Sequence, residues 1–306
     1  MSRWSPHPLT LRQLQYALAV AEFGSFRKAA QACAIAQPSL SAQIAQLEST
    51  LGVVLFERLS RGVVVTAAGR EVIERAERTL LAADDLVAAA ERRRDPDAGT
   101  LHIGVIPTVA PYLLPEVVPL LRKRYPRLQL LWAEEKTTTL LARLEAGTLD
   151  AGIVALDQEL GDLAHAELGR DPFLLAVPVG HELARGSAPA QLEHLEGEMV
   201  LVLDDGHCFR DQVLSVCQRA GADEASVRAT SLSTLAQMVA GGIGITLLPR
   251  LAIATENRAR SLVTRPFGPR GPSRTLALAW RRTSPAAAML SAVAGVIRKA
   301  LLPLLS

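Results

Sequence analysis

Cysteine and aromatic residues are scarce in this 306-residue chain, which has three cysteines and 4% aromatic residues. So few thiols exclude the disulfide framework that stabilises small secreted domains. No apolar run reaches the roughly 18 residues that span a bilayer, and the N-terminus lacks the apolar stretch of a signal peptide. We therefore expect a cytoplasmic protein without membrane contact, and its length indicates two or three domains.

Basic residues are concentrated at the N-terminal end, although the formal net charge is only +2. Residues 1–70 contain seven arginines and lysines against three glutamates, whereas basic and acidic residues are equal in number over 96–306. A basic head on a neutral body suits a nucleic-acid contact at one end of the protein. A solvated basic surface would give the same count.

The N-terminal residues have the pattern of a helix-turn-helix. Apolar residues recur at helical spacing over 11–22, Gly24 ends that helix, and Ser25 caps a second one. Pro38 lies where the first turn of a third helix tolerates proline. The polar side chains of this third helix project away from its apolar stripe, which predicts helix, short turn and helix with a free polar face.

A hairpin and a long helix are expected next. Residues 55–58 and 63–65 flank Arg61-Gly62 and predict a two-stranded wing. Thr66 can cap a helix that continues to about Arg94, with apolar residues spaced alternately by four and three. Such a stripe is typical of a coiled-coil seam, and nothing in its own small domain is expected to cover it, so we predict pairing with a second copy. Residues 95–99 then form a hinge.

Strands and helices alternate beyond the hinge, which predicts a parallel or mixed α/β sheet in two lobes with a cleft between them. The chain would thus hold a winged helix-turn-helix domain at 9–66, a linker and dimerisation helix at 67–95, and a regulatory domain at 96–306. Lobe I would cover about 100–169 and 276–306, and lobe II about 170–275. The expected strands are 101–106, 128–133, 152–156, 173–177, 199–203, 227–229, 245–247 and 276–281.

Cys208 lies between His207 and Phe209, with Arg210 and Asp211 close by. Nearby cationic groups favour the thiolate, which is the form that attacks a peroxide oxygen to give a sulfenic acid. Cys217, nine residues on, could resolve that acid as a disulfide. A helical spacing of nine residues spans ~13 Å, whereas a disulfide needs Cα atoms within about 7 Å. Bridging the pair would therefore unwind or refold this segment.

Several ordered motifs resemble the LysR-type transcriptional regulators, and those after residue 100 resemble the peroxide-sensing members of that family. The N-terminal motifs are Phe26-Arg27-Lys28-Ala29-Ala30, Gln37-Pro38-Ser39-Leu40-Ser41, Leu47-Glu48, Leu51-Gly52, Leu55-Phe56-Glu57-Arg58 and Thr66-Ala67-Ala68-Gly69. The later ones include Ile103-Gly104-Val105-Ile106-Pro107-Thr108, the run from Asp204 to Gln212, Cys217 and Gly244-Ile245-Thr246-Leu247-Leu248-Pro249. The resemblance covers nearly the whole chain.

The resemblance implies a periplasmic-binding-protein-like regulatory domain and a switch in which Cys208 is the peroxidatic thiol and Cys217 the resolving thiol. It also implies that the hydroxyls of Thr108 and Thr137 line a peroxide pocket that His207, Arg210 and Asp211 help to shape. Thr137 is followed by two further threonines, and it is preferred by position. No cofactor is expected.

The resemblance further implies double-stranded DNA as a partner. Short polar side chains at the start of the third helix would meet base edges, and arginines would hold phosphates. The expected DNA-binding residues are Gln37, Ser39 and Ser41 at base edges, placed there by Pro38 at the helix start, and Arg12, Arg58 and Arg61 at phosphates. Paired copies would bind promoter half-sites, two dimers would form a homotetramer, and RNA polymerase is expected as a partner of this activator or repressor.

Other interpretations stay open at this point. The cleft could bind a small metabolite, as in most LysR-type regulators, with the cysteines incidental. A thiol peroxidase would explain Cys208 and Cys217 but not the N-terminal domain. Zinc is disfavoured because His207 and the two cysteines lack an evident fourth ligand. Cys33 is expected in the helical core, and Arg92-Arg93-Arg94 at a solvated helix end.

Overall fold

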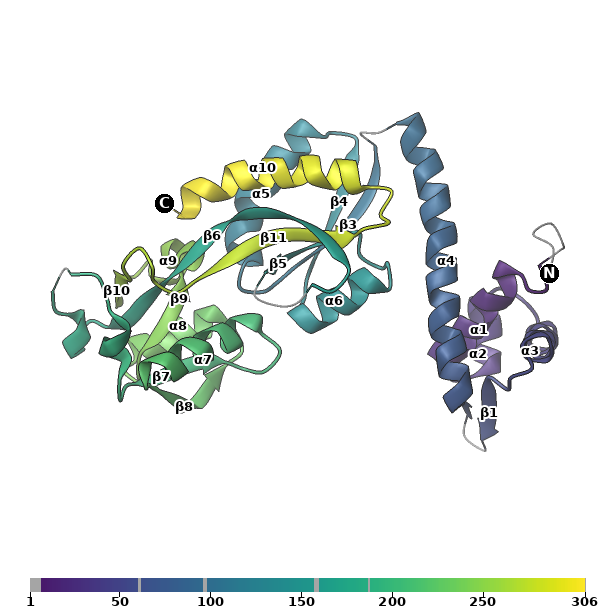
Figure 1. The fold of residues 1–306 in the computed structure, drawn as a ribbon, viewed down its shortest axis with the longest axis horizontal. Helices are drawn as coiled ribbons and strands as arrows, with labels where there is room; N and C mark the ends of the chain where they lie inside the picture. Colours follow the sequence, from purple (N-terminus) through teal and green to yellow (C-terminus); the bar gives the residue numbers. More distant parts are fainter. Residues whose placement is uncertain (1–6, 60–61, 96–97, 157–159, 187, 306) are drawn as a thin grey trace. The chain divides into compact units, whose positions relative to one another are not determined.

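The computed structural model describes residues 7–59, 62–95, 98–156, 160–186 and 188–305. The chain forms two compact units, Met1–Ala90 and Glu91–Ser306 (Figure 1). Each unit has its own buried apolar core.

Three short helices and a hairpin precede one long helix in the first unit. The helices are α1 (Leu11–Phe23), α2 (Phe26–Ala32), α3 (Gln37–Leu51) and α4 (Ala67–Arg94), and the antiparallel hairpin is β1 (Phe56–Leu59) with β2 (Gly62–Val65). These elements agree with the pattern expected from the sequence. They are the parts of a winged helix-turn-helix followed by a long helix.

Local side chains fix where these helices begin and end. Thr10 and Gln13 form a reciprocal capping box at the start of α1, and Gly24 ends that helix in the left-handed conformation. At the start of α4 the backbone N–H of Gly69 donates to Oγ1 of Thr66 over 2.8 Å. Each contact satisfies a backbone group that a helix end would otherwise leave without a partner.

The apolar stripe of α4 is used differently from the expectation. Val72, Ala76 and Leu80 pack against the helical core of their own unit, and Ala76 is 3% exposed. The expectation that this unit has nothing to cover the stripe is therefore wrong for its first half, because α1–α3 supply an apolar partner. Leu86 and Val87 stay exposed in the second half. Apolar surface for pairing is thus confined to the later turns.

One lobe of the second unit is built on three parallel strands. The strand β3 (Gly99–Val105) pairs in parallel with β4 (Leu128–Glu134) and with β5 (Ala151–Ala155). The helices α5 (Ala110–Arg124) and α10 (Ala287–Leu305) lie on one face of this sheet and α6 (Thr137–Glu145) on the other (Figure 1). We call this part lobe I.

The other lobe, lobe II, places three helices around shorter strands. The strand β7 (Met199–Leu203) pairs in parallel with β8 (Asp223–Ala229). The strands β9 (Thr246–Pro249) and β10 (Leu262–Pro266) pair antiparallel with the long strand β6 (Leu163–Pro178). The helices are α7 (Cys208–Ala220), α8 (Leu232–Ala240) and α9 (Arg250–Glu256), with 3-10 turns η1 (Glu182–Ala184) and η2 (Leu192–Leu195).

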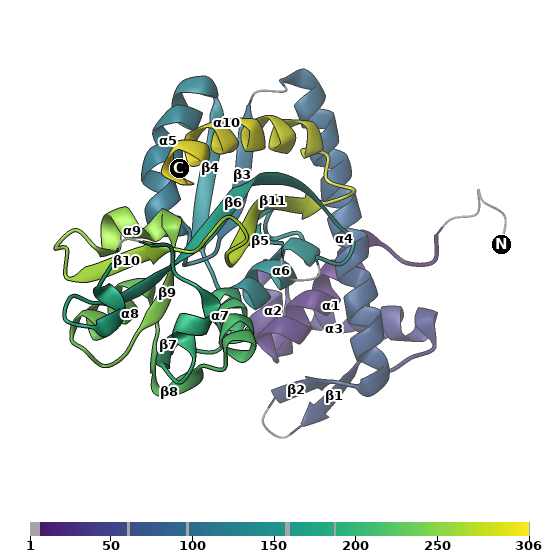
Figure 2. The ribbon, with the colours of Figure 1, turned by 60° about the vertical axis from the view of Figure 1, so that its left-hand side comes forward.

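Two long antiparallel strands, β6 (Leu163–Pro178) and β11 (Ser273–Arg281), connect the lobes (Figure 2). They place all the strands described in the second unit, except β7 and β8, in one mixed sheet, with the order β10-β6-β11-β5-β3-β4 and β9 beside β6. The predicted strand at 173–177 is only the lobe II end of β6. The short strand β10 was not expected at all.

The helix α10 is long and apolar enough to cross a membrane by length and composition, alone among the described helices. Arg298 and Lys299 interrupt its apolar sequence, so the helix contains no uninterrupted apolar run of that length. Leu290, Ile297 and Leu301 lie in the core of the second unit and are fully buried. This one-sided burial is typical of a core helix of a folded domain.

Candidate functional site

Cys208 is the first residue of α7, directly after a tight turn. That turn needs Gly206, whose φ of +88° lies in the left-handed region that favours glycine. His207 precedes the helix in extended conformation as its N-cap. Cys208 therefore lies at a helix start, where backbone N–H groups have no partner within the helix.

Cys217 lies on the same helix, and both cysteines are buried, with 4% and 3% of their surfaces exposed. Nine residues are about two and a half helical turns, or ~13 Å along the axis, so the two side chains leave opposite sides of the helix. A disulfide requires Cα atoms within about 7 Å. The observed conformation is therefore a dithiol state. A disulfide between the two cysteines cannot form unless part of α7 unwinds.

The environment of Cys217 disfavours its thiolate form. Burial raises the pKa of its thiol to about 11, and the negative charge of Glu224 acts in the same direction. Cys217 is therefore protonated at neutral pH, whereas the thiolate is the attacking form.

Thr108 is held by a buried arginine that the sequence analysis did not single out. Nη1 of Arg274 donates to Oγ1 of Thr108 over 2.7 Å, and Nη2 donates to its carbonyl over 3.0 Å. The same guanidinium pairs with Asp171 at 2.9 Å, and both charged side chains are 0% exposed. It also lies 5.5 Å from the centre of the Phe209 ring. Arg274 thus connects Thr108 to the residue after Cys208.

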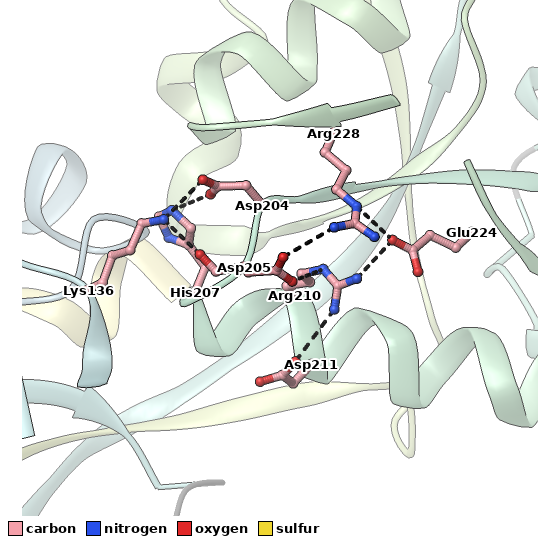
Figure 3. A network of polar contacts seen from close by, with 8 residues as sticks. All are labelled: Lys136, Asp204, Asp205, His207, Arg210, Asp211, Glu224 and Arg228. Carbon is pink, nitrogen blue, oxygen red and sulfur yellow. Dashed lines mark hydrogen bonds and ion pairs between the residues drawn. The ribbon is translucent and has the colours of Figure 1, made fainter. Parts of the chain in front are cut away.

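Thr137 belongs to lobe I, as the first residue of α6. Its Oγ1 is one of the buried side-chain atoms without a hydrogen-bond partner in the described part of the chain. The preceding residue, Lys136, donates from Nζ to Oδ2 of Asp204 over 3.0 Å (Figure 3). Oδ1 of Asp204 lies 3.0 Å from Nε2 of His207. This series of contacts connects Thr137 to the residue before Cys208.

Indirect contacts thus link Thr108 and Thr137 to the residues on either side of Cys208, one of which is His207. Thr108 is linked through Arg274, and Thr137 through Lys136 and Asp204. Both threonines are buried, with 2% and 4% of their surfaces exposed. A small molecule that both donates and accepts hydrogen bonds would satisfy the Thr137 hydroxyl, which is costly to leave unpaired.

Arg210 and Asp211 are placed differently from the threonines. Nη2 of Arg210 donates to Glu224 on β8 over 2.9 Å, and its Nε lies 3.5 Å from Asp205 (Figure 3). Arg228 contacts the same two acids, at 3.2 Å and 3.3 Å. The side chain of Asp211 is 68% exposed. Arg210 therefore fastens the first turn of α7 to β8, and Asp211 faces solvent.

Metal chemistry gains no support from the described residues, which contain no group of three or more His, Cys, Asp or Glu side chains placed to hold an ion. Cys33 is the C-cap of α2 and is partly buried against the helical core, far along the chain from the other two cysteines. It offers an internal reference thiol for experiments on Cys208 and Cys217.

The start of α3 presents the polar surface that the sequence predicts for base contacts. Gln37, Pro38 and Ser39 are exposed in its first turn, and Ser41 is partly exposed. Arg12 is exposed on α1, and Arg58 on β1 lies with its guanidinium 4.6 Å from the centre of the Phe26 ring. Arg61 lies outside the described residues.

Glu48 has a structural task that the sequence analysis did not assign. Its Oε1 accepts from the backbone N–H groups of Leu55 and Phe56 at 2.7 Å and 3.2 Å. These bonds fix the start of β1 against α3. The wing is thereby held in a defined position relative to the helix with the free polar face.

The pH dependence of stability gives a test of the His207 environment. Burial, and then the nearby positive charge of Lys136, lower the pKa of His207, while Asp204 opposes the shift. Below the ordinary pKa of about 6.5 the unfolded state then binds the proton more readily than the native state, so stability falls as pH falls. We expect His207→Asn to flatten this fall between pH 7.5 and 5.5.

The measurement is chemical unfolding of the full chain at several pH values. His165→Asn provides the matched control, because His165 is exposed on β6. An unchanged pH profile in the His207 variant, or an equal change in the His165 variant, would contradict the assigned environment.

Residues 11–70 match the family described as bacterial regulatory helix-turn-helix protein, lysR family, and residues 94–302 match the LysR substrate binding domain. The chain is 42% identical over 291 residues to the DNA-binding transcriptional dual regulator OxyR of Escherichia coli K12, covering 95% of each. It therefore belongs to the LysR family of bacterial transcription regulators.

Solved structures agree with this assignment. A full-length cysteine-to-aspartate variant of OxyR from Pseudomonas aeruginosa is similar with a TM-score of 0.75 and 33% identity, covering 96% of each chain. A cysteine-to-serine mutant of Corynebacterium glutamicum OxyR with hydrogen peroxide bound has a TM-score of 0.67 and 34% identity, covering 98% of this chain and 94% of that one.

Proposed function

We propose that this chain is a DNA-binding transcription regulator that senses hydrogen peroxide through Cys208 and is switched by a Cys208–Cys217 disulfide. The observation that carries the proposal is the position of Cys208 as the first residue of α7, directly after His207, whose Nε2 lies 3.0 Å from Oδ1 of Asp204. The similarity to OxyR proteins along almost the whole chain supports it.

The chemistry needs only two thiols and one peroxide. The Cys208 thiolate attacks one peroxide oxygen, so that an S–O bond forms, the O–O bond breaks, and the departing hydroxide takes a proton to become water. The sulfur of Cys217 then attacks the Cys208 sulfur, an S–S bond forms, and the S–O bond breaks to release a second water. Two thiols are oxidised and one peroxide is reduced to two waters.

The change of shape follows from the helix geometry. The second step cannot occur while Cys208 and Cys217 lie at opposite sides of an intact α7, so the first turns of that helix must unwind. The contacts that hold those turns, from Arg210 to Glu224 and from Asp204 to Lys136, are then broken or remade. Oxidation of one sulfur thereby alters how lobe II meets lobe I.

The regulator acts stoichiometrically, as a cytoplasmic DNA-binding protein and not as an enzyme. Exposed Leu86 and Val87 on α4 offer an apolar surface for pairing two copies, and two such dimers would form a tetramer on promoter half-sites. The polar start of α3 would meet base edges. RNA polymerase is the partner through which a change of shape would reach transcription.

Disulfide mapping tests this proposal. The purified full chain is treated with a near-stoichiometric dose of hydrogen peroxide, quenched with an alkylating agent and mapped by peptide mass analysis. We expect a Cys208–Cys217 bridge within seconds, with Cys33 still alkylated. A Cys208→Ser variant should show no bridge and no loss of thiol at Cys217.

Each other outcome favours a different function. Both thiols persisting after the dose would contradict peroxide sensing and favour a metabolite bound between the lobes. Rapid, repeated turnover with a thiol reductant would favour a thiol peroxidase. A bridge that includes Cys33 would contradict the assignment of Cys217 as the resolving thiol.

A further inference from the structure

Lys136 joins the two lobes at the thiol site. It belongs to lobe I as the N-cap residue of α6, yet its side chain ends on the turn before α7 in lobe II. Nζ donates to Oδ2 of Asp204 over 3.0 Å and to the carbonyl of Asp205 over 2.7 Å (Figure 3). The stem passes so close to Gly206 that a Cβ there would lie 3.1 Å from Cδ of Lys136.

The residues that Lys136 binds are those that must move when α7 unwinds. Asp204 and Asp205 belong to the turn that ends at the cap of α7, only a few residues before Cys208. Drawing the Cys208 sulfur towards Cys217 shifts this turn from its present place. The two bonds from Nζ require both the carboxylate and the carbonyl to stay where they are, so they cannot both survive the shift.

The second group of ion pairs at this site differs in what it connects. Arg210 and Arg228 bind Asp205 and Glu224, all of which lie in lobe II (Figure 3). Those pairs hold α7 to its own lobe. Lys136 instead holds the same turn to lobe I, so its release would change the contact between lobes.

We infer that Lys136 is a positioning residue of the redox switch. It stabilises the dithiol state by holding the turn between β7 and α7 against lobe I, and its bonds to that turn break when the disulfide forms. This inference rests on the proposed function, since it needs the Cys208–Cys217 bridge. Lys136 takes no part in the transfer of electrons or protons. Its bonds to the turn shift the equilibrium between dithiol and disulfide towards the dithiol.

The expected effect is moderate because the ion pair is partly exposed, with 39% of the Lys136 side chain and 35% of the Asp204 side chain accessible. Such a pair shifts an equilibrium by up to roughly fivefold. Losing the bridge destabilises only the dithiol state, so the disulfide becomes harder to reduce. For a two-electron couple, where tenfold corresponds to about 30 mV, fivefold corresponds to a midpoint potential about 20 mV more negative.

The test is a redox titration of the full-length chain in dithiothreitol buffers, with the bridge quantified by mass analysis. Lys136→Met removes the charge and keeps a long side chain. Lys123→Met is the matched control, because Lys123 is an exposed lysine on α5. Each protein is titrated at about 0.05 M and about 1 M salt, since salt screens exposed charge pairs.

We expect the Lys136 variant to have the more negative potential at low salt and the Lys123 variant to match the unmodified chain. High salt should move the potential of the unmodified chain towards that of the Lys136 variant and should shift the variant less, because the variant has already lost this ion pair. Equal potentials in all three proteins, or a less negative potential in the Lys136 variant, would overturn the inference while leaving peroxide sensing intact. If the unmodified chain forms no Cys208–Cys217 bridge, the proposed function itself fails.

Discussion

Replacing Asp171 with alanine should destabilise the second unit by about 3–5 kcal/mol, because it leaves a buried guanidinium without its counter-charge. Arg274 and Asp171 are 0% exposed and 2.9 Å apart. Asp171 also accepts the backbone N–H of Leu251 over 3.1 Å, so the variant loses a second buried bond. Arg274 would then be free to turn away from Thr108, which disturbs the thiol site as well as stability.

Chemical unfolding of the full chain measures this effect, followed through the fluorescence of Trp132 and Trp280, which both lie in the second unit. The double variant Asp171→Ala with Arg274→Met is the control. Removing both charges should cost less than the two single losses added together, because no buried charge is left unpaired. A loss below about 1 kcal/mol in the single variant would show that the pair contributes little.

The N-terminal elements were predictable because their causes are local. The helical spacing over 11–22, the stop at Gly24 and the cap at Thr66 each act within a few residues. The structure reproduces helices and wing nearly to the residue. What the same local reasoning missed is the use of α4, since the packing of Ala76 and Leu80 depends on a surface formed by three other helices.

The connecting strands were harder to predict because their causes are distant in the chain. The first part of β6 includes the polar residues His165, Glu167 and Arg170, and its extended conformation comes from pairing with β11 about a hundred residues later. The strand β10 contains the buried Arg265, whose guanidinium donates to the carbonyls of Leu183 and Ala188. A charged side chain within a short strand is a weak sequence signal.

The candidate site shows the same division. Cys208, Cys217 and His207 could be singled out because they are neighbours in one short segment with recognisable chemistry. Arg274 and Asp171 are 103 residues apart, so nothing local pairs them. A usable signal did exist, since charged residues are almost never fully buried unless paired. Two opposite charges at paired positions of adjacent strands could have been matched once the strand order and register were known.

Replacing Gln37 with alanine should weaken binding to a preferred DNA site by about fivefold to 150-fold while leaving non-specific binding nearly unchanged. Gln37 is exposed at the first position of α3, where a recognition helix meets base edges, and a good base contact contributes ~1–3 kcal/mol of discrimination. The probe is a duplex selected from a random pool by the unmodified protein, compared with a scrambled duplex of equal length.

Arg58→Ala is the contrasting variant, because a phosphate contact carries no sequence information. It should weaken binding to both duplexes alike and reduce the slope of log affinity against log salt by about one, since one counterion fewer is released. Because its guanidinium lies over the Phe26 ring, the fold of this variant is checked by unfolding first. Equal losses on both duplexes for Gln37→Ala would move that residue from base reading to phosphate contact. If Gln37→Ala binds both duplexes as tightly as the unmodified protein, the start of α3 is not part of the DNA interface.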